Sequence, residues 1–456
     1  MSNRIMFSAV SSGSGKTLIT CGILQALVNR GLNVASFKCG PDYIDPMFHS
    51  KVIGAKSRNL DSFFTKENEI KYLLEKNSVD MDISVMEGVM GFYDGLAGIS
   101  KKASSYDVAK ITKTPVILII NCKGMSLSIL PVIKGFMEYA KDSNIKGVIL
   151  NKMSKMIYDD IKNLIEKELK IKVLGYVEDV KDLTIESRHL GLVKPEEVLN
   201  LKEKLNNLAK ILEETLEIDE IINLAKASEK LEYTKPEIKK INHKVKIAVA
   251  RDEAFCFYYE DNLELLKEMG AEIKYISPLR DKELPKEIDG IILGGGYPEL
   301  YAKELSKNIC FLEDINKRIN EGLPCLAECG GFMYLNNSLE DKEGNIFPMA
   351  KVLDGDSYKT SKLGRFGYID IECLKDNFLC KKGEIIKAHE FHYWDSTICG
   401  EDFNAKKPLR KRSWKCINTT ENLFAGFPHL YFYSNLEVPY RFLNKCIEYG
   451  GKNEFR

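Results

Sequence analysis

The segment that most constrains the fold is a glycine-rich loop near the N-terminus, Ser11–Thr17, which reads SSGSGKT. It follows the short apolar run Ile5–Val10 and precedes Leu18–Arg30, whose apolar residues recur with helical spacing. A strand that ends in a Gly-x-Gly-Lys-Thr loop and continues as a helix is the local structure of a phosphate-binding P-loop. The sequence therefore predicts a parallel α/β domain that binds the phosphates of a nucleotide.

The residue types of this loop indicate what each residue does. Gly13 and Gly15 let backbone N–H groups approach phosphate oxygens, and the N-terminus of the following helix adds a positive dipole. Lys16 is predicted to bridge the terminal phosphates, and the Thr17 hydroxyl to bind Mg²⁺. Val10 stands where the common form of the loop has its first glycine, so an ordinary glycine-rich turn is the alternative. The combination of strand, loop and helix favours the nucleotide site.

Acidic residues follow two further predicted strands. Val34–Phe37 leads into Lys38–Pro46 (KCGPDYIDP), and Ile83–Met86 leads into Glu87–Gly95 (EGVMGFYDG). Ligands of parallel α/β sheets bind at the carboxyl ends of strands, so these carboxylates are expected beside the P-loop. There they could hold Mg²⁺ or orient a nucleophile. A single loop carboxylate more often caps a helix or faces water. Two acidic motifs that both follow strands next to a P-loop favour a magnesium or substrate site instead.

The middle of the chain changes in composition. Lys, Glu, Leu and Asn dominate from Pro195 to Lys244, where glycine is absent, which predicts one or two charged amphipathic helices. We therefore divide the chain into a P-loop domain at residues 1–195, a charged helical connector at 196–243 and a second α/β domain at 244–449. The last ~110 residues are predicted to be β-rich with hairpin turns.

The second domain contains a candidate nucleophile. Pro324–Ala327 is a predicted strand that runs into Glu328-Cys329-Gly330-Gly331, a tight turn with small neighbours that exposes the middle side chain. The helix N-terminus after it is expected to lower the pKa of the Cys329 thiol. Gly294–Gly296 ends another strand and could supply oxyanion-hole amides. Spacing alone does not choose the general base among three histidines: His389, His392 and His429.

Bulk properties exclude several classes of protein. The chain has 456 residues and 66 basic against 66 acidic residues, which argues against a generally basic nucleic-acid binder. It has no apolar run of the ~20 residues that a membrane helix needs and no visible secretory signal, so we expect a cytoplasmic protein. The twelve cysteines contain no Cys-x-x-Cys pair, and apart from Cys329 most are expected to be buried without a metal or a disulfide.

These motifs resemble the cobyrinate a,c-diamide synthase family, which are glutamine-dependent amidotransferases of corrin biosynthesis. The resemblance covers nearly the whole chain. In the first half of the chain it rests on the P-loop and on the motifs Lys38–Pro46, Asn59–Asp61, Glu87–Gly95 and Glu186–Leu192. In the second half it rests on Asp252–Tyr259, Gly294–Glu299, Glu328–Tyr334 and His389–Tyr393.

The resemblance implies an N-terminal domain of the dethiobiotin-synthetase type, which binds ATP, Mg²⁺ and the tetrapyrrole. It implies a C-terminal class I glutamine amidotransferase domain in which Cys329 attacks glutamine and His429 raises its nucleophilicity, with no acidic third member assigned. By motif position, five residues line the ATP and substrate site: Asp42, Tyr43, Asp45, Glu87 and Asp94. Of these, Glu87 is expected, with Thr17, to contact the metal, and Asp42 to contact the metal or the substrate. Gly295, Gly296 and Gly330 are expected to form the oxyanion hole.

The family's reaction is amidation of the a and c acetate carboxylates of cobyrinate through acyl phosphates, in cobalamin biosynthesis. A carboxylate does not react with ammonia directly, because oxide is a poor leaving group. Ammonia is made at one site and used at another, so an internal passage for ammonia is expected. Ni-sirohydrochlorin, as in coenzyme F430 formation, and hydrogenobyrinate remain alternative substrates. A non-catalytic P-loop ATP-binding or partitioning protein is the rival from another class. A homodimer is left open, and no nucleic acid or membrane partner is expected.

Overall fold

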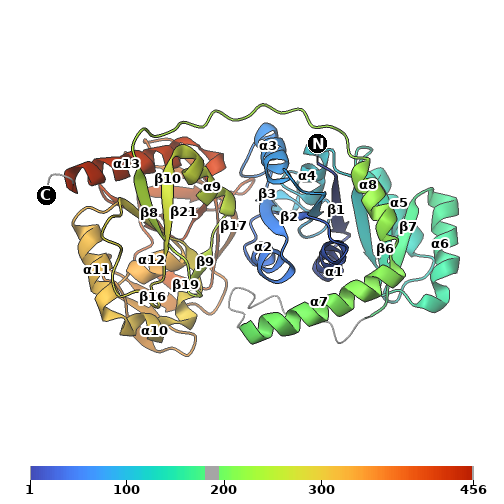
Figure 1. Cartoon of the computed structure of the whole chain (residues 1–456), viewed down its shortest axis with the longest axis horizontal. Coiled ribbons are helices and arrows are strands. Elements are labelled where there is room, and N and C mark those ends of the chain that lie inside the picture. Colours follow the sequence, from blue (N-terminus) through green and yellow to red (C-terminus); the bar gives the residue numbers. More distant parts are fainter. Residues whose placement is uncertain (1, 180–194, 454–456) are drawn as a thin grey trace. The chain divides into compact units, whose positions relative to one another are not determined.

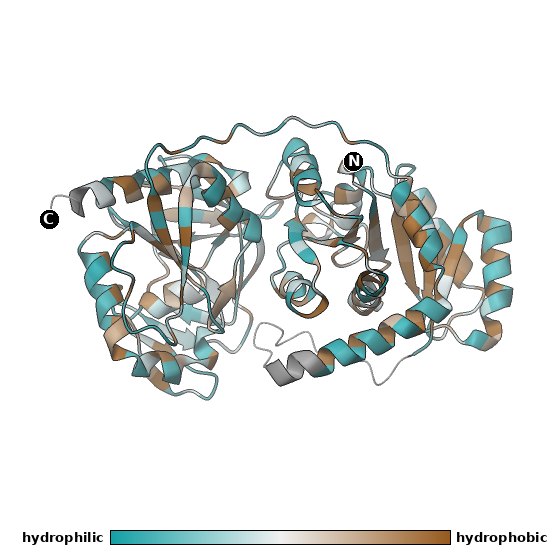
Figure 2. Cartoon of the chain, viewed as in Figure 1, coloured by the Kyte–Doolittle hydropathy of each residue, from teal (hydrophilic) through white to brown (hydrophobic). Residues whose placement is uncertain are grey.

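The computed structural model describes residues 2–179 and 195–453. The chain separates into two compact units, residues 1–236 and 237–456 (Figure 1). Both contain a mainly parallel sheet with flanking helices, which confirms the α/β class. Figure 2 shows apolar residues concentrated in the strands, where buried parallel strands need them. Among the described residues, no helix is long and apolar enough to cross a membrane. The Glu186–Leu192 motif lies outside the described residues.

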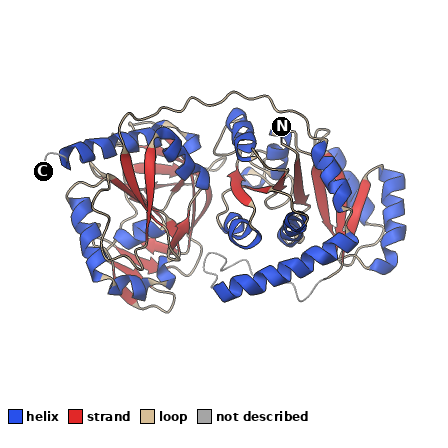
Figure 3. Cartoon of the chain, in the orientation of Figure 1, coloured by secondary structure: helices blue, strands red, loops and turns tan. Residues whose placement is uncertain are grey.

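The first unit is built on a seven-stranded parallel sheet in the order β3-β2-β4-β1-β5-β6-β7. Helices lie on both of its faces, as Figure 3 shows. The strands are β1 (Arg4–Ala9), β2 (Val34–Cys39), β3 (Lys56–Leu60), β4 (Ile83–Glu87), β5 (Val116–Asn121), β6 (Ile145–Asn151) and β7 (Lys172–Val177). The helices are α1 (Lys16–Asn29), α2 (Ile44–Phe48), the π-helix η1 (His49–Ile53), α3 (Glu67–Asn77), η2 (Leu96–Gly98), α4 (Ser105–Ile111), α5 (Ile129–Tyr139), α6 (Lys155–Leu169), α7 (Pro195–Thr215) and α8 (Ile218–Lys226).

Helices α7 and α8 belong to the first unit, which differs from the connector expected at residues 196–243. Leu208 and Leu212 of α7 and Ile221 of α8 are fully buried in the same apolar cluster as β1 and α1. A Cβ on Gly22 of α1 would lie 2.5 Å from a methyl group of Leu212, so the two helices pack closely. The charged composition predicts amphipathic helices of a connector, but one apolar face of each helix completes the core of the first unit.

The segment that joins the two units is short and irregular. On the first unit, Asn68 of α3 exchanges two hydrogen bonds of 2.8 Å with the backbone of Thr234. On the second unit, the backbone N–H of Ile241 donates to the Met269 carbonyl at 2.8 Å. Between these two anchors, the Lys239 ammonium also donates to the Glu437 carboxylate at 2.5 Å, so the link between the units is shorter than the composition suggested.

The second unit has a six-stranded sheet in the order β10-β8-β11-β13-β23-β22, parallel except for its last pair. Three smaller sheets accompany it. One pairs β9 with β12, and the other two come mostly from the last ~110 residues, which confirms that this region is β-rich. The strands are β8 (Val245–Ala250), β9 (Phe255–Phe257), β10 (Ala271–Ile276), β11 (Gly290–Leu293), β12 (Gly295–Gly296), β13 (Cys325–Glu328), β14 (Ser338–Glu340), β15 (Ile346–Pro348), β16 (Asp356–Lys359), β17 (Arg365–Cys373), β18 (Ile385–His392), β19 (Trp394–Ser396), β20 (Phe403–Lys406), β21 (Ser413–Cys416), β22 (Asn418–Thr419), β23 (Leu423–Gly426) and β24 (His429–Leu430). The helices are α9 (Glu260–Met269), η4 (Pro298–Leu300), α10 (Ala302–Lys307), α11 (Ile309–Asn320), α12 (Gly330–Leu335), η5 (Phe432–Ser434) and α13 (Glu437–Asn453).

Candidate functional site

The P-loop lies between β1 and α1, and its conformation requires glycine. Gly15 has φ +87°, and a Cβ there would lie 2.2 Å from the amide nitrogen of Asn151. That amide, at the end of β6, donates to the Ser14 carbonyl at 2.8 Å and so ties the loop to the sheet. Lys16 is nearly buried and donates to the Met90 carbonyl at 2.9 Å. Asn151 was not found by sequence reasoning, because no motif marks it.

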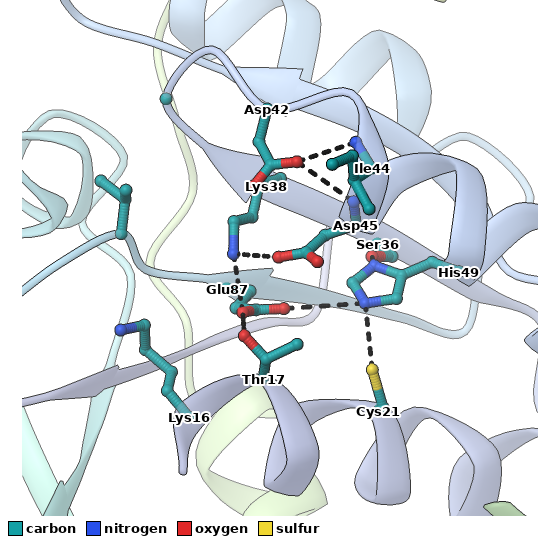
Figure 4. A network of polar contacts seen from close by, with 12 residues as sticks. Lys16, Thr17, Cys21, Ser36, Lys38, Asp42, Ile44, Asp45, His49 and Glu87 are labelled. Carbon is teal, nitrogen blue, oxygen red and sulfur yellow. Dashed lines mark hydrogen bonds and ion pairs between the residues drawn. The ribbon is translucent and has the colours of Figure 1, made fainter. Parts of the chain in front are cut away.

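A buried cluster of charges lies at the carboxyl ends of β2 and β4, beside the start of α1 (Figure 4). Lys38 and Glu87 are register partners on these neighbouring strands. The Lys38 ammonium donates to Glu87 Oε1 at 2.7 Å and also to the Asp45 carboxylate. The Thr17 hydroxyl donates to the same Oε1 of Glu87 at 2.6 Å. The structure thus brings together three of the predicted residues, Thr17, Asp45 and Glu87.

Lys38 is a site residue that sequence reasoning missed, although it opens a quoted motif. Burial opposes the charged form of Lys38, but the carboxylates of Glu87 and Asp45 outweigh it and hold the Lys38 pKa well above its usual value. Burial likewise opposes ionisation of Asp45, and the Lys38 ammonium overcomes this and lowers the pKa of Asp45. A lysine that ends a buried strand next to acidic motifs was the signal available in the sequence.

The remaining predicted acidic residues take different positions around this cluster. Asp42 accepts the backbone N–H groups of Ile44 and Asp45 at 2.9 and 3.1 Å, which starts α2. Burial, and then the charge of Asp45, raise the pKa of Asp42 to about 6. Tyr43 is buried at the start of α2. Asp94 is exposed and accepts the N–H of Gly91 at 2.9 Å, and Gly91 also lies against the carbonyl of Val10, which precedes the P-loop.

The second candidate site is the turn between β13 and α12. Cys329 has φ +48°, a left-handed conformation that is uncommon for a residue with a Cβ and typical of a strained nucleophile elbow. The turn is fixed by the Cys329 N–H, which donates to the Gly426 carbonyl at 2.8 Å, and by the Gly331 N–H, which donates to the Gly294 carbonyl at 2.9 Å. A Cβ on Gly331 would lie 2.2 Å from the Leu293 carbonyl oxygen, so only glycine fits there.

The expected lowering of the Cys329 pKa is not found. The thiol is 6% exposed, and its burial raises its pKa, as does the nearby Glu299 carboxyl. The Gly330 N–H donates to the sulfur and opposes both effects without cancelling them. The dipole of a one-and-a-half-turn helix is too weak to offset this burial, so the net direction of the pKa shift is upward.

His429 lies against Gly295, and Gly330, which follows Cys329, lies against Gly296. A Cβ on Gly295 would lie 2.5 Å from Cε1 of His429, and a Cβ on Gly330 would lie 3.1 Å from the Gly296 nitrogen. Glu328, which precedes Cys329 in β13, pairs with Gly426 at the end of β23. His429 follows β23 in the chain, on the neighbouring strand's side of the Cys329 turn. The structure therefore brings together Cys329, His429 and the three predicted oxyanion-hole glycines.

Two further residues adjoin His429. Glu328 Oε2 lies 3.7 Å from His429 Nδ1, while Oε1 accepts the Leu430 N–H at 3.1 Å. His389 stacks on His429 with ring centroids 4.9 Å apart, and its Nδ1 is within 3.2 Å of the Tyr259 hydroxyl. Burial, and then the charge of His429, hold the pKa of His389 well below its usual value.

His392, the third candidate base, has other partners. Its ring stacks on Phe427 with centroids 3.9 Å apart, and Nδ1 lies 2.5 Å from the Trp394 carbonyl oxygen.

The cysteines other than Cys329 form no disulfide, and ten of all twelve are buried, with Cys310 exposed and Cys399 partly exposed. This confirms the interpretation of most of them as small buried residues.

Comparison with known proteins agrees with both halves of this description. Residues 5–193 match the CobQ/CobB/MinD/ParA nucleotide binding domain, and residues 246–436 match the CobB/CobQ-like glutamine amidotransferase domain. Cobyrinate a,c-diamide synthase from Caldanaerobacter subterraneus subsp. tengcongensis is 42% identical over 98% of this chain and 99% of its own length. The proteins of the same name from Thermoplasma volcanium and Clostridium acetobutylicum are 39% and 40% identical over 99% and 95% of this chain, and over 99% and 98% of their own lengths. The chain therefore belongs to the cobyrinate a,c-diamide synthase family.

Proposed function

We propose that this protein uses ATP and glutamine to amidate the a and c acetate carboxylates of cobyrinate, in cobalamin biosynthesis. One observation carries the proposal: relatives of that name align with the chain over nearly its whole length. The site geometry supports it, because the buried Lys38–Glu87 cluster adjoins a P-loop in one unit and a cysteine elbow lies in the other. A non-catalytic ATP-binding protein would have no use for that elbow.

In the first unit, the terminal phosphoryl group of ATP is transferred to an acetate oxygen of the macrocycle, giving an acyl phosphate and ADP. Lys16, which lies at the end of the P-loop, neutralises charge on the transferring group. Lys38 offers a second ammonium whose charge is held by Asp45 and Glu87. Asp42, Tyr43 and Asp94 line the same site. Ammonia then attacks the acyl carbon, phosphate leaves, and the amide forms.

The residues beside the P-loop fit a magnesium ion that accompanies ATP. Glu87 is fully buried, and its Oε2 has no hydrogen-bond partner among the described residues, so a cation would satisfy it. Thr17 Oγ1 and Glu87 are the proposed ligands, with Asp42 near them. No group of three or more His, Cys, Asp or Glu side chains in the described chain could hold a metal alone, so oxygens of the nucleotide phosphates and of water would have to contribute as ligands. When bound, Mg²⁺ neutralises phosphate charge.

In the second unit, Cys329 Sγ attacks the side-chain amide carbon of glutamine. The thiol proton passes to His429 and then to the leaving nitrogen, which departs as ammonia. N–H groups of Gly295, Gly296 and Gly330 stabilise the oxyanion of the tetrahedral intermediate. Water then hydrolyses the thioester and releases glutamate. Glu328, whose Oε2 lies 3.7 Å from Nδ1 of His429, orients the imidazole.

The test is an amidation assay with glutamine and ATP·Mg²⁺, with products identified by mass. Cobyrinic acid, hydrogenobyrinic acid and Ni-sirohydrochlorin are offered in parallel. A gain of two amides on cobyrinic acid is the expected result. Turnover on only one of the other macrocycles would refute cobyrinate as substrate and leave the residue roles intact. Glutamine hydrolysis without any amidation would refute the acceptor class.

A further inference from the structure

A buried carboxyl group lies beside Cys329 and has no part in the steps proposed above. Glu299 is 9% exposed and belongs to η4, shortly after Gly296 of the proposed oxyanion hole. After burial itself, the charge of Glu299 is the largest cause of the raised pKa of the Cys329 thiol. The ring of Pro298, the residue before Glu299, lies 2.9 Å from the position of a Cβ on Gly330. The segment that carries Glu299 therefore packs against the turn that carries the nucleophile.

The backbone on both sides of Glu299 is held in place. Before it, the Tyr297 N–H donates to the Ala254 carbonyl at 2.9 Å. After it, the Tyr301 N–H donates to the Pro298 carbonyl at 3.0 Å, which closes the turn of η4. The backbone that carries the Glu299 carboxyl is therefore fixed before any substrate binds.

Glu299 differs from the other two carboxylates near the nucleophile, because it has no partner outside its own residue. Glu328 accepts the Leu430 N–H at 3.1 Å, and Glu390 accepts the indole N–H of Trp414 at 3.3 Å. The Glu299 carboxylate accepts its own backbone N–H. No cationic side chain among the described residues pairs with it, so its charge is left without a counter-ion.

A buried carboxylate without a counter-ion is costly and calls for an explanation. Burial raises the pKa of Glu299 to about 7, so the free enzyme disfavours the charged form of this group. The missing partner is a cation, and glutamine brings one to this site. Its reacting amide is uncharged, while its other end carries an α-ammonium and an α-carboxylate. A buried carboxylate attracts the first of these groups and repels the second.

We propose that Glu299 binds the α-ammonium of glutamine and so makes the second unit select the free amino acid over other primary amides. This inference rests on the glutaminase step of the proposed function. A substrate without the ammonium would leave the buried carboxylate unpaired, which costs the full desolvation of that group. The α-ammonium is remote from the reacting carbon, so its contact is the same in the bound substrate and in the transition state. The contact therefore acts on KM rather than on kcat.

The test compares glutamine with glutaramic acid, which is glutamine without its α-amino group. Release of ammonia from each compound is measured as kcat/KM in the full-length wild type and in Glu299→Gln. We expect the wild type to prefer glutamine by about 10–100-fold, the effect of one hydrogen bond between charged groups. In Glu299→Gln, kcat/KM for glutamine should fall by about the same factor, through KM, while the value for glutaramic acid stays within about 3-fold. Equal losses on the two substrates would indicate a structural role and overturn the proposal.

Glu390→Gln is the matched control, because it removes the same charge from a buried carboxylate near Cys329 that already has a partner. It should keep the wild-type preference for glutamine, whatever its effect on turnover. Loss of the preference in Glu390→Gln but not in Glu299→Gln would overturn the proposal, because the ammonium would then bind at Glu390.

Tryptophan fluorescence reports whether each Glu299 variant is folded, since both tryptophans belong to the second unit. Should Glu299→Gln fail to fold, Glu299→Asp keeps the charge and withdraws it by one methylene group. A smaller preference for glutamine is expected there, and an unchanged one would refute the proposal. Failure of the wild type to amidate cobyrinate would refute the acceptor alone, because release of ammonia from glutamine is measured without it.

Discussion

Replacing Lys38 by methionine tests whether the charge cluster is held together by one buried cation. Lys38 pairs with Asp45 and, at 2.7 Å, with Glu87, and the side chains of all three residues are at most 9% exposed. At that separation the attraction of a unit charge pair is about 6 kcal/mol with an effective dielectric constant of about 20. Methionine keeps most of the volume but removes the ammonium that contacts both buried carboxylates. Breaking such a pair from one side costs about 3–5 kcal/mol, which we expect as the loss of first-unit stability at pH 8.

The loss should depend on pH in a defined direction. In the wild type Lys38 lowers the pKa of Asp45, so Asp45 contributes stability that is present above its unfolded pKa and lost as pH falls through its folded pKa. In Lys38→Met the largest charge that opposes burial is gone, so burial raises the pKa of Asp45. The free energy of unfolding of the variant's first unit then falls as pH rises above about 4, the ordinary pKa of a carboxyl group. The difference between the two proteins should therefore be greatest near pH 8 and shrink towards pH 4.

The assay can separate the two units within the intact chain. Both tryptophans, Trp394 and Trp414, belong to the second unit, so their fluorescence in a urea titration reports that unit. Circular dichroism reports both units, and its extra transition belongs to the first. Lys16→Met is the matched control, because the Lys16 ammonium makes a single hydrogen bond within the described part of the chain, to the Met90 carbonyl, and its loss should change stability by about 1 kcal/mol or less. A Lys38→Met variant that unfolds within 1 kcal/mol of the wild type at pH 8 would refute the reasoning.

Three other predictions concern the two sites. Cys329→Ala should abolish glutamine-driven amidation but keep ammonia-driven amidation within about 2-fold, because the nucleophile acts only on glutamine; loss of both in a folded variant would contradict separate sites. Lys16→Ala should remove amidation from either nitrogen source while glutaminase activity survives, and retained amidation would refute the P-loop assignment. Burial raises the pKa of Glu299 to about 7. The stability of the wild type therefore falls as pH rises from 4.5 to 7, because the buried carboxyl must ionise. Glu299→Gln should therefore stabilise the second unit by up to about 3 kcal/mol at pH 8 and hardly at pH 4.5, measured by tryptophan fluorescence in urea, and equal stability at both pH values would refute this.

The local parts of both sites could be predicted from the sequence. A P-loop and a cysteine elbow are each made by consecutive residues, whose glycines and small side chains satisfy a conformation that few other residues adopt. Gly15 with φ +87° and Gly331 pressed against a backbone carbonyl are examples. The strand runs of Val and Ile likewise predicted the parallel sheets, because burial on both faces excludes polar residues.

The contacts between distant residues were decided by the tertiary structure. The sequence gives no means to tell that Lys38 meets Glu87 49 positions away, or that His49 lies beneath that carboxylate. The same holds for Glu328 and His389 beside His429, and for the depth at which Cys329 is buried, which reversed the predicted direction of its pKa.

The amino-acid sequence by itself determined the fold class, the glycine-rich loop after β1 and the turn at Cys329, since each depends on interactions within a few residues. Packing decided the rest: which charges pair, how far each site is removed from water, and that α7 and α8 complete the first core rather than bridge the domains. Electrostatic energies depend on separation and burial in space, and neither quantity is a property of a position in the chain.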